Sequence, residues 1–419
     1  MTASVMALAN PQAAGPAAPY GATLEAALSC AGFTAAYGEI ATWPGYAPTP
    51  LVALPAFARE VRLGAVLYKD EAGRFGLASF KPLGGAYAVA RVLARELKRR
   101  GIAEAATAAD FAAGRYAEAV CDITITSATD GNHGRSVAWG ARMFGCKAVI
   151  VIHETVSEGR RAAIAAFGAE VVRVAGGYDD SVRHAFAEAA KNGWHVVQDT
   201  ATATYREVPA DITYGYGVIA EEIVQEIAEP PTHVIVQAGV GGVASAICAR
   251  FWQHLGARRP KFIVLEPVQA ACVAASLRAG RRADVTGDID SVMAGLACGE
   301  VSELAWEVLA TGANGAIVID DDWALAGMRR LASPVDGDPA IVAGECSGGA
   351  AGALMALADR EDLRAVLGLD ATSRVLVIGT EGATDPEIYM RIVGRTPAEV
   401  VSPSSCLESS SKHNDGATS

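Results

Sequence analysis

Short runs of consecutive apolar residues alternate with helical patterns through the middle of this chain. The runs predict strands at residues 121–128, 147–152, 170–174, 195–198, 233–237, 261–266 and 374–379. The helical patterns cover 133–144, 157–167, 179–191, 217–228 and a segment that begins at 241. Apolar strands separated by helices are typical of parallel sheets covered on both faces. We therefore predict an α/β fold.

Two sheets are expected rather than one. Residues 120–175 can pack as a small βαβα unit, and the later strands then belong to a larger sheet. We assign 41–87 and 193–400 to a large domain and 88–192 to a small domain. We expect 1–40 to be a flexible N-terminal segment, since it begins with an Ala- and Pro-rich stretch, and the Ser-rich 401–419 to be a disordered tail.

Composition and charge argue against several classes of function. The 419 residues carry a formal net charge of -12, which argues against nucleic acid as the main partner. The seven histidines form no HxxxH or HExxH pair, so no metal site is expected. The eight cysteines form no CxxC pair and are expected to be reduced thiols of a cytoplasmic protein. No apolar run reaches about 18 residues, and no basic residue precedes Arg59, so neither a membrane-spanning helix nor a secretory signal is expected.

The first candidate for chemistry is Lys81, which lies in 79–87 at the start of a Gly-containing helical pattern. An amine that is shielded from water can act as a nucleophile toward a carbonyl group. The alternative is a solvated lysine at a helix N-terminus, although a cation is electrostatically unfavourable there.

A Gly-rich turn, 238–242, follows the predicted strand 233–237 and opens a helix. Glycines let the backbone approach a ligand closely and direct several amides at one phosphate. The spacing is not the GxGxxG of dinucleotide-binding proteins, because Ala244 stands at the last glycine position. This turn can instead be purely structural, or it can bind a nucleotide in a protein without catalytic activity. A nucleotide-binding protein leaves two residues unexplained: Lys81 and Asp130, an acidic residue that follows the predicted strand 121–128.

Two further polar loops follow predicted strands. In 129–134, Asn132 can cap the next helix or bind a cofactor oxygen, and the backbone amides can hold a carboxylate. Asp130 in the same loop offers a carboxylate for proton transfer. Thr380 follows the strand 374–379 and can place its hydroxyl at a ring nitrogen.

Together and in this order, these motifs resemble the fold-type II enzymes that depend on pyridoxal 5′-phosphate (PLP). Within that group they are most similar to the diaminopropionate ammonia-lyase family. The similarity covers roughly residues 40–395 and is carried by 69–71, 74–89, 128–139, 196–201, 237–242, 293–300 and 379–386. Asp130 discriminates between relatives, because serine and threonine dehydratases typically have Ala at that place.

The resemblance implies two domains, each with a mainly parallel sheet flanked by helices, and PLP as the cofactor. It implies that Lys81 forms a Schiff base with PLP and exchanges a proton at the substrate's α-carbon. Asp130 would then be a second acid or base on the opposite face. Implied cofactor contacts are Asn132 at the 3′-oxygen, Gly239, Val240, Gly241 and Gly242 at the phosphate, and Thr380 at the pyridine nitrogen. Implied substrate contacts are Thr129, Gly131 and His133, with Asp199 as a further catalytic residue near the substrate amine.

The implied reaction is α,β-elimination of ammonia from 2,3-diaminopropionate, in its D form, its L form or both, to give pyruvate and ammonia. Removing an α-proton needs an electron sink, and PLP supplies one. The resemblance also implies a homodimer that acts on a small amino acid.

Two segments depart from the family pattern. In 201–217, residues 202–204 and Asp211 stand where bulkier side chains are expected, and 344–349 differs slightly from the family's Glu-Ser-Gly-Ala pattern. If 201–214 lines the substrate pocket, we expect a substrate other than 2,3-diaminopropionate. The alternative is that these differences are neutral changes in a loop. The alternative function is therefore a PLP-dependent dehydratase or lyase acting on serine, threonine or another β-substituted alanine.

Overall fold

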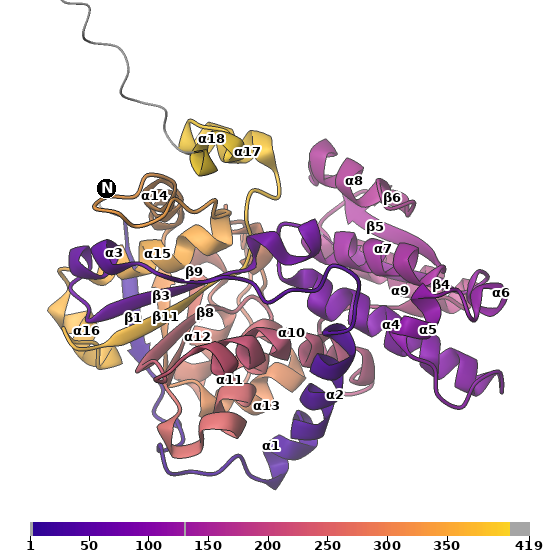
Figure 1. Ribbon diagram of the computed structural model, residues 1–419, viewed down its shortest axis with the longest axis horizontal. Helices are drawn as coiled ribbons and strands as arrows, with labels where there is room; N and C mark the ends of the chain where they lie inside the picture. The colour runs from indigo at the N-terminus through magenta and orange to yellow at the C-terminus, as the bar shows by residue number, and fades with distance from the viewer. Residues whose placement is uncertain (1–2, 130, 403–419) are drawn as a thin grey trace, which may run out of the picture.

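A computed structural model describes residues 3–129 and 131–402 (Figure 1). Two sheets form its framework, one of seven strands and one of four. Helices cover both faces of the larger sheet and flank the smaller one (Figure 1). The prediction of an α/β fold with two mainly parallel sheets is confirmed.

The larger sheet has the strand order β1-β10-β9-β8-β11-β3-β2. Its strands are β1 (Val5–Ala9), β2 (Leu51–Ala53), β3 (Ala65–Asp70), β8 (His233–Gln237), β9 (Lys261–Pro267), β10 (Gly315–Ile319) and β11 (Arg374–Gly379). The central strands are parallel, while the edge strands β1 and β2 run antiparallel to their neighbours. The carboxyl ends of the central strands therefore meet at one edge of the sheet, where ligands bind in such folds.

The smaller sheet is parallel throughout, with the order β6-β5-β4-β7. Its strands are β4 (Thr124–Thr129), β5 (Lys147–His153), β6 (Glu170–Val174) and β7 (His195–Val196), connected by α7 (Asn132–Phe144), α8 (Glu158–Ala165) and α9 (Tyr178–Asn192). Gly145 and Gly193 follow α7 and α9 in the left-handed conformation that commonly ends a helix.

The apolar runs that predicted strands are strands in the structure, and both of their faces are buried. In β8, Val234 and Val236 face one core, while Ile235 faces the other. Side chains alternate between the two faces along a strand, so a run without polar residues fills both cores at once. This geometry is the reason that continuous apolar runs predicted these strands.

The helices divide between the two faces of the larger sheet. On one side lie α2 (Cys30–Ile40), α4 (Lys81–Arg99), α10 (Glu207–Glu226), α11 (Gly242–Leu255) and α13 (Glu303–Gly312). On the other lie α3 (Pro55–Glu60), α14 (Asp321–Ala332), α15 (Glu345–Leu357) and α16 (Glu361–Leu367). The remaining helices are α1 (Ala22–Ala27), η1 (Glu71–Gly76), α5 (Ala108–Ala112), α6 (Ala117–Val120), η2 (Gly256–Arg258), η3 (Val268–Ala270), α12 (Cys272–Ala279), η4 (Ala294–Leu296), α17 (Pro386–Val393) and α18 (Pro397–Val401). Because α4 packs against both α7 and α10, it connects the two sheets.

The N-terminal segment differs from the prediction of a flexible stretch over 1–40. All five residues of β1 pair with β10, and α1 and α2 follow it. Phe33 and Ile40 of α2 are buried in the core. Edge pairing and burial order this segment, and its composition did not reveal either contact.

Other boundaries also differ from the prediction. β2, β3 and β10 were not predicted, and α10 begins at Glu207 instead of 217, with Pro209 in its first turn where proline is tolerated. β7 pairs with β4 of the smaller sheet, although residues from 193 onward were assigned to the large domain. The other domain boundaries stay predictions. The predicted disordered tail lies outside the described residues except for 401–402.

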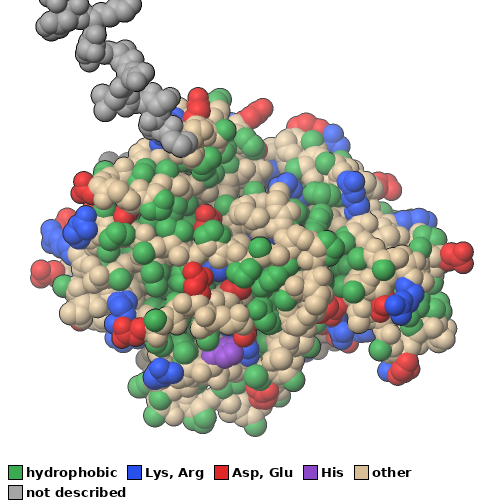
Figure 2. Space-filling model, in the orientation of Figure 1, with side chains coloured by type: hydrophobic (Ala, Val, Ile, Leu, Met, Phe, Trp, Pro, Cys, Tyr) green, Lys and Arg blue, Asp and Glu red, His purple; other side chains and the backbone are tan. Residues whose placement is uncertain are grey.

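The surface carries charges of both signs. Figure 2 shows acidic and basic side chains interspersed over one face of the molecule. Within residues 3–129 and 131–402, no helix has the length and apolar character needed to cross a bilayer. The same residues contain no group of His, Cys, Asp and Glu arranged to hold a metal ion, and their cysteines are free.

Candidate active site

The predicted site residues lie where strands of the two sheets end. The loop 239–242 follows β8, and Thr380 follows β11, both in the larger sheet. The loop 129–134 follows β4, and Asp199 lies shortly after β7, both in the smaller sheet. Lys81 begins α4, which packs between α7 and α10. The fold thus brings these distant segments to one region between the sheets, as expected for strand ends.

The backbone before Lys81 is held in an unusual conformation. Phe75 and Ala78 have φ angles of 51° and 55°, a region that side-chain-bearing residues rarely adopt. The Phe80 amide donates to the Thr380 carbonyl oxygen at 3.0 Å, which ties this segment to the end of β11. Pro82 lies in the first turn of α4, where its fixed φ suits a helix start. The position of Lys81 is therefore set by the strand and by the helix together.

Glycines allow α4 to approach its neighbours closely. A Cβ on Gly85 would lie 2.0 Å from Ser136 Oγ of α7. A Cβ on Gly215 of α10 would lie 2.0 Å from the Leu83 carbonyl oxygen. Only glycine permits such approaches, so α4 is locked to helices of both sheets.

Lys81 and Asp199 form the centre of the site. Lys81 Nζ donates to Asp199 Oδ2 at 3.0 Å, and 20% of the lysine side chain is exposed. The rings of Phe80 and Tyr216 have their centroids 5.4 and 5.7 Å from Nζ. Burial alone would raise the pKa of Asp199, but Lys81 and His133 beside it lower that pKa to about 2. Asp199 is therefore an ionised carboxylate next to an amine that remains accessible.

The Thr129 side chain organises the described residues that follow β4. Thr129 Oγ1 accepts hydrogen bonds from the amides of Gly131 at 2.9 Å and Gly134 at 3.0 Å. His133 is buried, and its Nε2 lies 2.9 Å from the Val197 carbonyl oxygen. The three predicted substrate-binding residues of this loop thus lie together at the start of α7.

Asn132, the first residue of α7, extends toward the larger sheet. Its Nδ2 donates to Glu381 Oε2 at 2.7 Å, across 249 positions of sequence. Glu381 directly follows Thr380, so this bond brings two predicted cofactor contacts together. Asp130 lies outside the described residues, and its role as a second acid or base stays a prediction.

Thr380 offers a hydroxyl without a hydrogen-bond partner among the described residues. The residue is only 3% exposed. An unsatisfied buried hydroxyl costs about 1–3 kcal/mol, and an acceptor atom of a ligand would remove that cost. A pyridine nitrogen can accept this hydrogen bond, and Thr380 therefore fits PLP.

The loop after β8 has the backbone expected of an anion site. Gly239 and Gly241 have φ angles of 53° and 94°. The carbonyl oxygen of Val240 between them accepts a hydrogen bond from the Ser302 amide at 2.9 Å, which anchors the loop. α11 begins at Gly242, and the amides of a first helical turn have no acceptor within the helix. These amides suit a phosphate group.

The structure adds two buried carboxylates that the sequence prediction missed. Glu381 is 8% exposed, and its Oε1 accepts from the Cys346 amide at 3.1 Å at the start of α15. Glu345 lies nearby, and burial together with the charge of Glu381 raises the pKa of Glu345 to about 7. The signals in the sequence were the positions of Glu381 within the family-like segment 379–386 and of Glu345 within 344–349.

A second polar cluster, which we call the buried ionic network, comprises Lys69, Glu71, Arg74 and Glu222. Lys69 Nζ lies 2.7 Å from Glu222 Oε2. Arg74 pairs with Glu71 at 2.8 Å and with Glu222 at 2.8 Å. None of the four side chains is more than 1% exposed. The sign of this network in the sequence was Lys69, which directly follows the apolar run 65–68.

The segment that departs from the family pattern faces α4 and solvent. Residues 202–204 are exposed. Asp211 of α10 pairs with Arg95 of α4 at 2.6 Å. Tyr205 Oη donates to the Val196 carbonyl oxygen at 3.0 Å. Asp211, one of the unexpected residues, is thus a contact between two helices.

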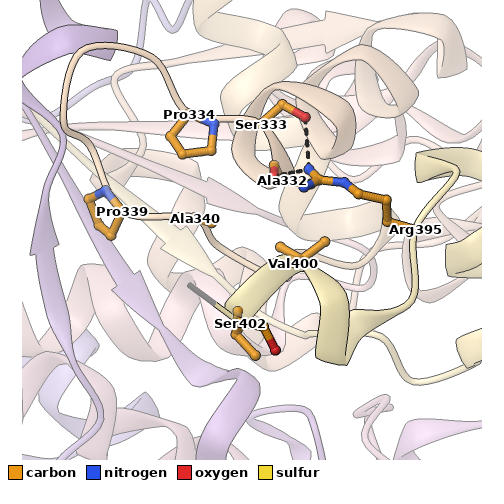
Figure 3. A pocket seen from close by; sticks show the side chains of 9 residues that line it. Ala332, Ser333, Pro334, Pro339, Ala340, Arg395, Val400 and Ser402 are labelled. Atoms are coloured by element: carbon orange, nitrogen blue, oxygen red, sulfur yellow. Dashed lines mark hydrogen bonds between the residues drawn. The ribbon is translucent and has the colours of Figure 1, made fainter. Parts of the chain in front are cut away.

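A cavity of about 590 Å³ lies elsewhere, between α14 and the α17–α18 region (Figure 3). It is lined by residues 332–334, 339–340, Arg395 and 400–402. Arg395 donates to the Ala332 carbonyl oxygen and, at 2.9 Å, to Ser333 Oγ. None of the predicted site residues lines it, so this cavity is separate from the candidate active site.

A family model described as "Pyridoxal-phosphate dependent enzyme" matches residues 42–381. The diaminopropionate ammonia-lyase of Salmonella typhimurium is 40% identical over 363 residues, which cover 84% of this chain and 89% of that protein. The diaminopropionate ammonia-lyase of Escherichia coli K12 is 39% identical over 355 residues, covering 83% and 88%.

Solved structures show the same similarity. Holo diaminopropionate ammonia lyase from Escherichia coli matches with a TM-score of 0.84 at 35% identity, covering 94% of this chain and 97% of that chain. Its complex with an aminoacrylate-PLP azomethine reaction intermediate matches with a TM-score of 0.82 at 35% identity, covering 94% and 97%. These matches span nearly the full length of this chain and of each matched chain. The chain therefore belongs to the pyridoxal-phosphate dependent enzymes and, within them, to the family of the diaminopropionate ammonia-lyases.

Proposed function

We propose that this protein is a PLP-dependent carbon–nitrogen lyase that eliminates ammonia from 2,3-diaminopropionate and yields pyruvate and ammonia. The observation that carries this proposal is the partly exposed Lys81 amine, 3.0 Å from the Asp199 carboxylate, between the two sheets. The substrate is taken from the relatives, which are named diaminopropionate ammonia-lyases.

The residues around Lys81 match the needs of the cofactor. When bound, PLP supplies an electron sink for the substrate's α-carbon. Lys81 provides the amine for covalent attachment, and the amides of Gly239, Val240 and Gly242 would hold the phosphate. The Gly241 amide already donates to the Ala238 carbonyl oxygen at 2.8 Å. The unpartnered Thr380 hydroxyl would meet the pyridine nitrogen. Asn132, which donates one N–H to Glu381, would offer its second N–H to the 3′-oxygen.

The reaction needs a base at the α-carbon and a proton for the leaving nitrogen. Lys81 accepts the α-proton on one face, and Asp130 is proposed to act on the opposite face. The electron pair of the broken C–H bond forms the new double bond, while the β-nitrogen leaves as ammonia. Hydrolysis of the unsaturated product releases the α-nitrogen as ammonia and leaves pyruvate.

The smaller sheet supplies the proposed contacts to the substrate. The loop of Thr129, Gly131 and His133 binds the carboxylate, and Asp199 lies near the amine. Asp199 suits this role because its carboxylate stays ionised beside Lys81. We further infer, from the family alone, a cytoplasmic homodimer with a role in amino-acid catabolism.

A second candidate is the elimination of water from serine, threonine or another β-substituted alanine. One observation favours it: diaminopropionate ammonia lyase from Escherichia coli has been crystallised in complex with D-serine. Serine and diaminopropionate differ only in the group that leaves the β-carbon, so the two candidates share every proposed step except protonation of the leaving group.

The decisive experiment is a substrate panel with the purified holoenzyme. D- and L-diaminopropionate, D- and L-serine and L-threonine are added, and the 2-oxo acid product is measured. We expect pyruvate from diaminopropionate at a rate at least about tenfold above serine, the discrimination expected when a site pairs a leaving amine that serine lacks. Faster release from serine would favour the second candidate, and a protein without PLP absorbance would contradict both.

The same assay tests the two-base role. Asp130→Asn is expected to reduce the rate with one enantiomer by about 10²-fold or more, the usual contribution of a general base, and the other much less. Equal losses for both enantiomers would remove Asp130 from this role.

A further inference from the structure

Glu381 lies at a junction of three segments of the candidate active site. Its Oε2 accepts a hydrogen bond from Asn132 Nδ2 at 2.7 Å, and its Oε1 accepts one from the Cys346 amide at 3.1 Å. The first bond reaches the smaller sheet, and the second reaches the N-terminus of α15. One carboxylate therefore connects both sheets beside the predicted pyridine contact, Thr380.

The backbone of Glu381 is held as firmly as its side chain. Its amide donates to Ser347 Oγ at 2.8 Å, and Ser347 Oγ donates back to the Glu381 carbonyl oxygen at 2.6 Å. Glu381 also forms an isolated β-bridge with Ser79, and the Gly382 amide donates to the Ala78 carbonyl oxygen at 2.9 Å. The carboxylate is thus fixed relative to the segment that carries Lys81.

A carboxylate partner decides which way the Asn132 amide faces. A side-chain amide has two N–H donors on its nitrogen and an acceptor oxygen on the other side. Because the Glu381 oxygen accepts this hydrogen bond, the nitrogen of Asn132 faces Glu381 and its oxygen faces away. One N–H is used in that bond, and the second remains for another acceptor, such as the 3′-oxygen of PLP.

We propose that Glu381 is a positioning residue that orients the Asn132 amide, so that one N–H faces the cofactor and α7 is joined to the larger sheet. This inference rests on the proposed function, because that function places PLP between Asn132 and Thr380. Glu381 acts through Asn132, because its two carboxylate oxygens accept from Asn132 Nδ2 and from the Cys346 amide.

Glutamine and alanine test different parts of this arrangement. Glu381→Gln keeps the size and an acceptor for the Cys346 amide, but its amide can also donate and so allows Asn132 to face either way. Glu381→Ala removes both bonds. Glu387→Ala changes an exposed glutamate on α17 and is the matched control.

The experiment is a double-mutant cycle on PLP affinity. The apoenzyme of each variant is titrated with PLP and followed by absorbance, for wild type, Glu381→Gln, Glu381→Ala, Asn132→Ala and the double variant Asn132→Ala/Glu381→Ala. A hydrogen bond to a charged group contributes about 1.5–3 kcal/mol, so Glu381→Ala is expected to weaken PLP binding by about 10- to 100-fold. Glu381→Gln is expected to weaken it by about tenfold, and Glu387→Ala not at all.

The PLP affinity of the double variant decides whether Glu381 acts through Asn132. If Glu381 acts through Asn132, the double variant binds PLP no more weakly than Asn132→Ala alone. Additive losses would overturn the inference, as would wild-type affinity in both Glu381 variants. The thermal midpoint of each apoenzyme reports the lost contact with α15 separately, and Glu381→Gln replaces Glu381→Ala if the latter does not fold.

The outcome is separable from the proposed function. A wild-type protein that binds PLP but releases no pyruvate from diaminopropionate contradicts the proposed reaction, while the cycle on PLP affinity still decides the role of Glu381. A wild-type protein that does not bind PLP overturns both.

Discussion

The buried ionic network and the candidate active site are two polar clusters at opposite ends of the segment 69–81. In the network, Arg74 pairs with both Glu71 and Glu222, and Lys69 pairs with Glu222. The cluster is closed, because each charged group meets an opposite charge inside the protein.

The active site is open by contrast. The Thr380 hydroxyl has no partner among the described residues, and the Lys81 side chain is 20% exposed. Unsatisfied buried groups cost free energy, and a ligand atom that pairs with such a group removes that cost. The difference teaches that a polar cluster whose charges all pair within the protein supports the fold, whereas a cluster that combines an accessible amine with an unpartnered hydroxyl can bind a ligand.

The two clusters also depend on each other. β3 and η1, which hold Lys69, Glu71 and Arg74, lead directly into α4 and Lys81. Replacing a buried pair by apolar groups can be neutral, but removing one partner leaves an uncompensated charge. We infer that the network fixes the start of the segment whose other end presents Lys81.

The largest expected effect is on activity, from a change in the open cluster. Lys81→Ala removes the amine that binds the cofactor covalently and accepts the α-proton, so we expect the rate with diaminopropionate to fall by at least about 10³-fold. The free energy of unfolding should change by no more than about 2 kcal/mol, since the side chain is partly exposed. Steady-state pyruvate release and urea unfolding measure the two effects.

Lys98→Ala provides the control for this change. Lys98 lies in the last turn of the same helix, and its side chain is 60% exposed. The control is expected to keep wild-type activity. Full activity in Lys81→Ala would refute the assignment of the open cluster as the active site.

The next effect is on stability, from a change in the closed cluster. Glu222→Ala leaves Lys69 and Arg74 without their shared carboxylate, and we expect a loss of about 3–5 kcal/mol in the free energy of unfolding. Urea unfolding of the apoenzyme at a fixed protein concentration measures it. Glu226→Ala, an exposed position on the same helix, is the control. A loss below about 1 kcal/mol would mean that the network does not stabilise the fold.

Another buried carboxylate, Glu266, extends the comparison to the pH dependence of stability. Burial opposes ionisation of Glu222, but Arg74 and Lys69 hold its pKa below the ordinary value. Glu266 is fully buried at the end of β9, and its partners are the amides of Val273 at 2.8 Å and Ala274 at 2.7 Å. Burial raises the pKa of Glu266 to about 7, from an ordinary value of 4.5.

This shift predicts a loss of stability as pH rises. Between those two values the folded protein keeps the proton on Glu266, while the unfolded chain has released it, so the free energy of unfolding falls with increasing pH. We expect a fall of about 2–3 kcal/mol between about pH 5 and about pH 7 that Glu266→Gln does not share, because glutamine does not ionise. Urea unfolding of both proteins at the two pH values measures it, and parallel changes would contradict the assignment.

The sequence predicted those parts of the molecule that depend on short segments. Runs such as 233–237 and 374–379 are strands because each fills two cores, and the glycines after β8 follow from the turn itself. The order of the motifs was enough to predict the cofactor. Lys81, Asp199, Asn132 and the loops around them do lie in one region.

The parts that were missed depend on contacts between distant segments. β1 is a strand because β10 offers an edge roughly 300 residues later, and composition says nothing about such pairing. Glu222 becomes part of the ionic network only when α10 packs over β3. The proposed role of Glu381 depends on its hydrogen bond with Asn132, which lies 249 positions away. Local pattern carries no information on these partners.

The smallest expected effect tests whether the unpartnered Thr380 hydroxyl binds a ligand or is only a packing defect. Thr380→Val removes the unpartnered hydroxyl, so the apoenzyme should be unchanged or more stable by about 1 kcal/mol, while PLP affinity falls by about tenfold. Thr126 of β4 also has a buried hydroxyl without a partner among the described residues, but it is no part of the proposed site. Thr126→Val should therefore alter stability in the same direction and leave PLP affinity unchanged. Equal PLP affinity in the two variants would mean that the Thr380 hydroxyl, like that of Thr126, is only an imperfection of packing.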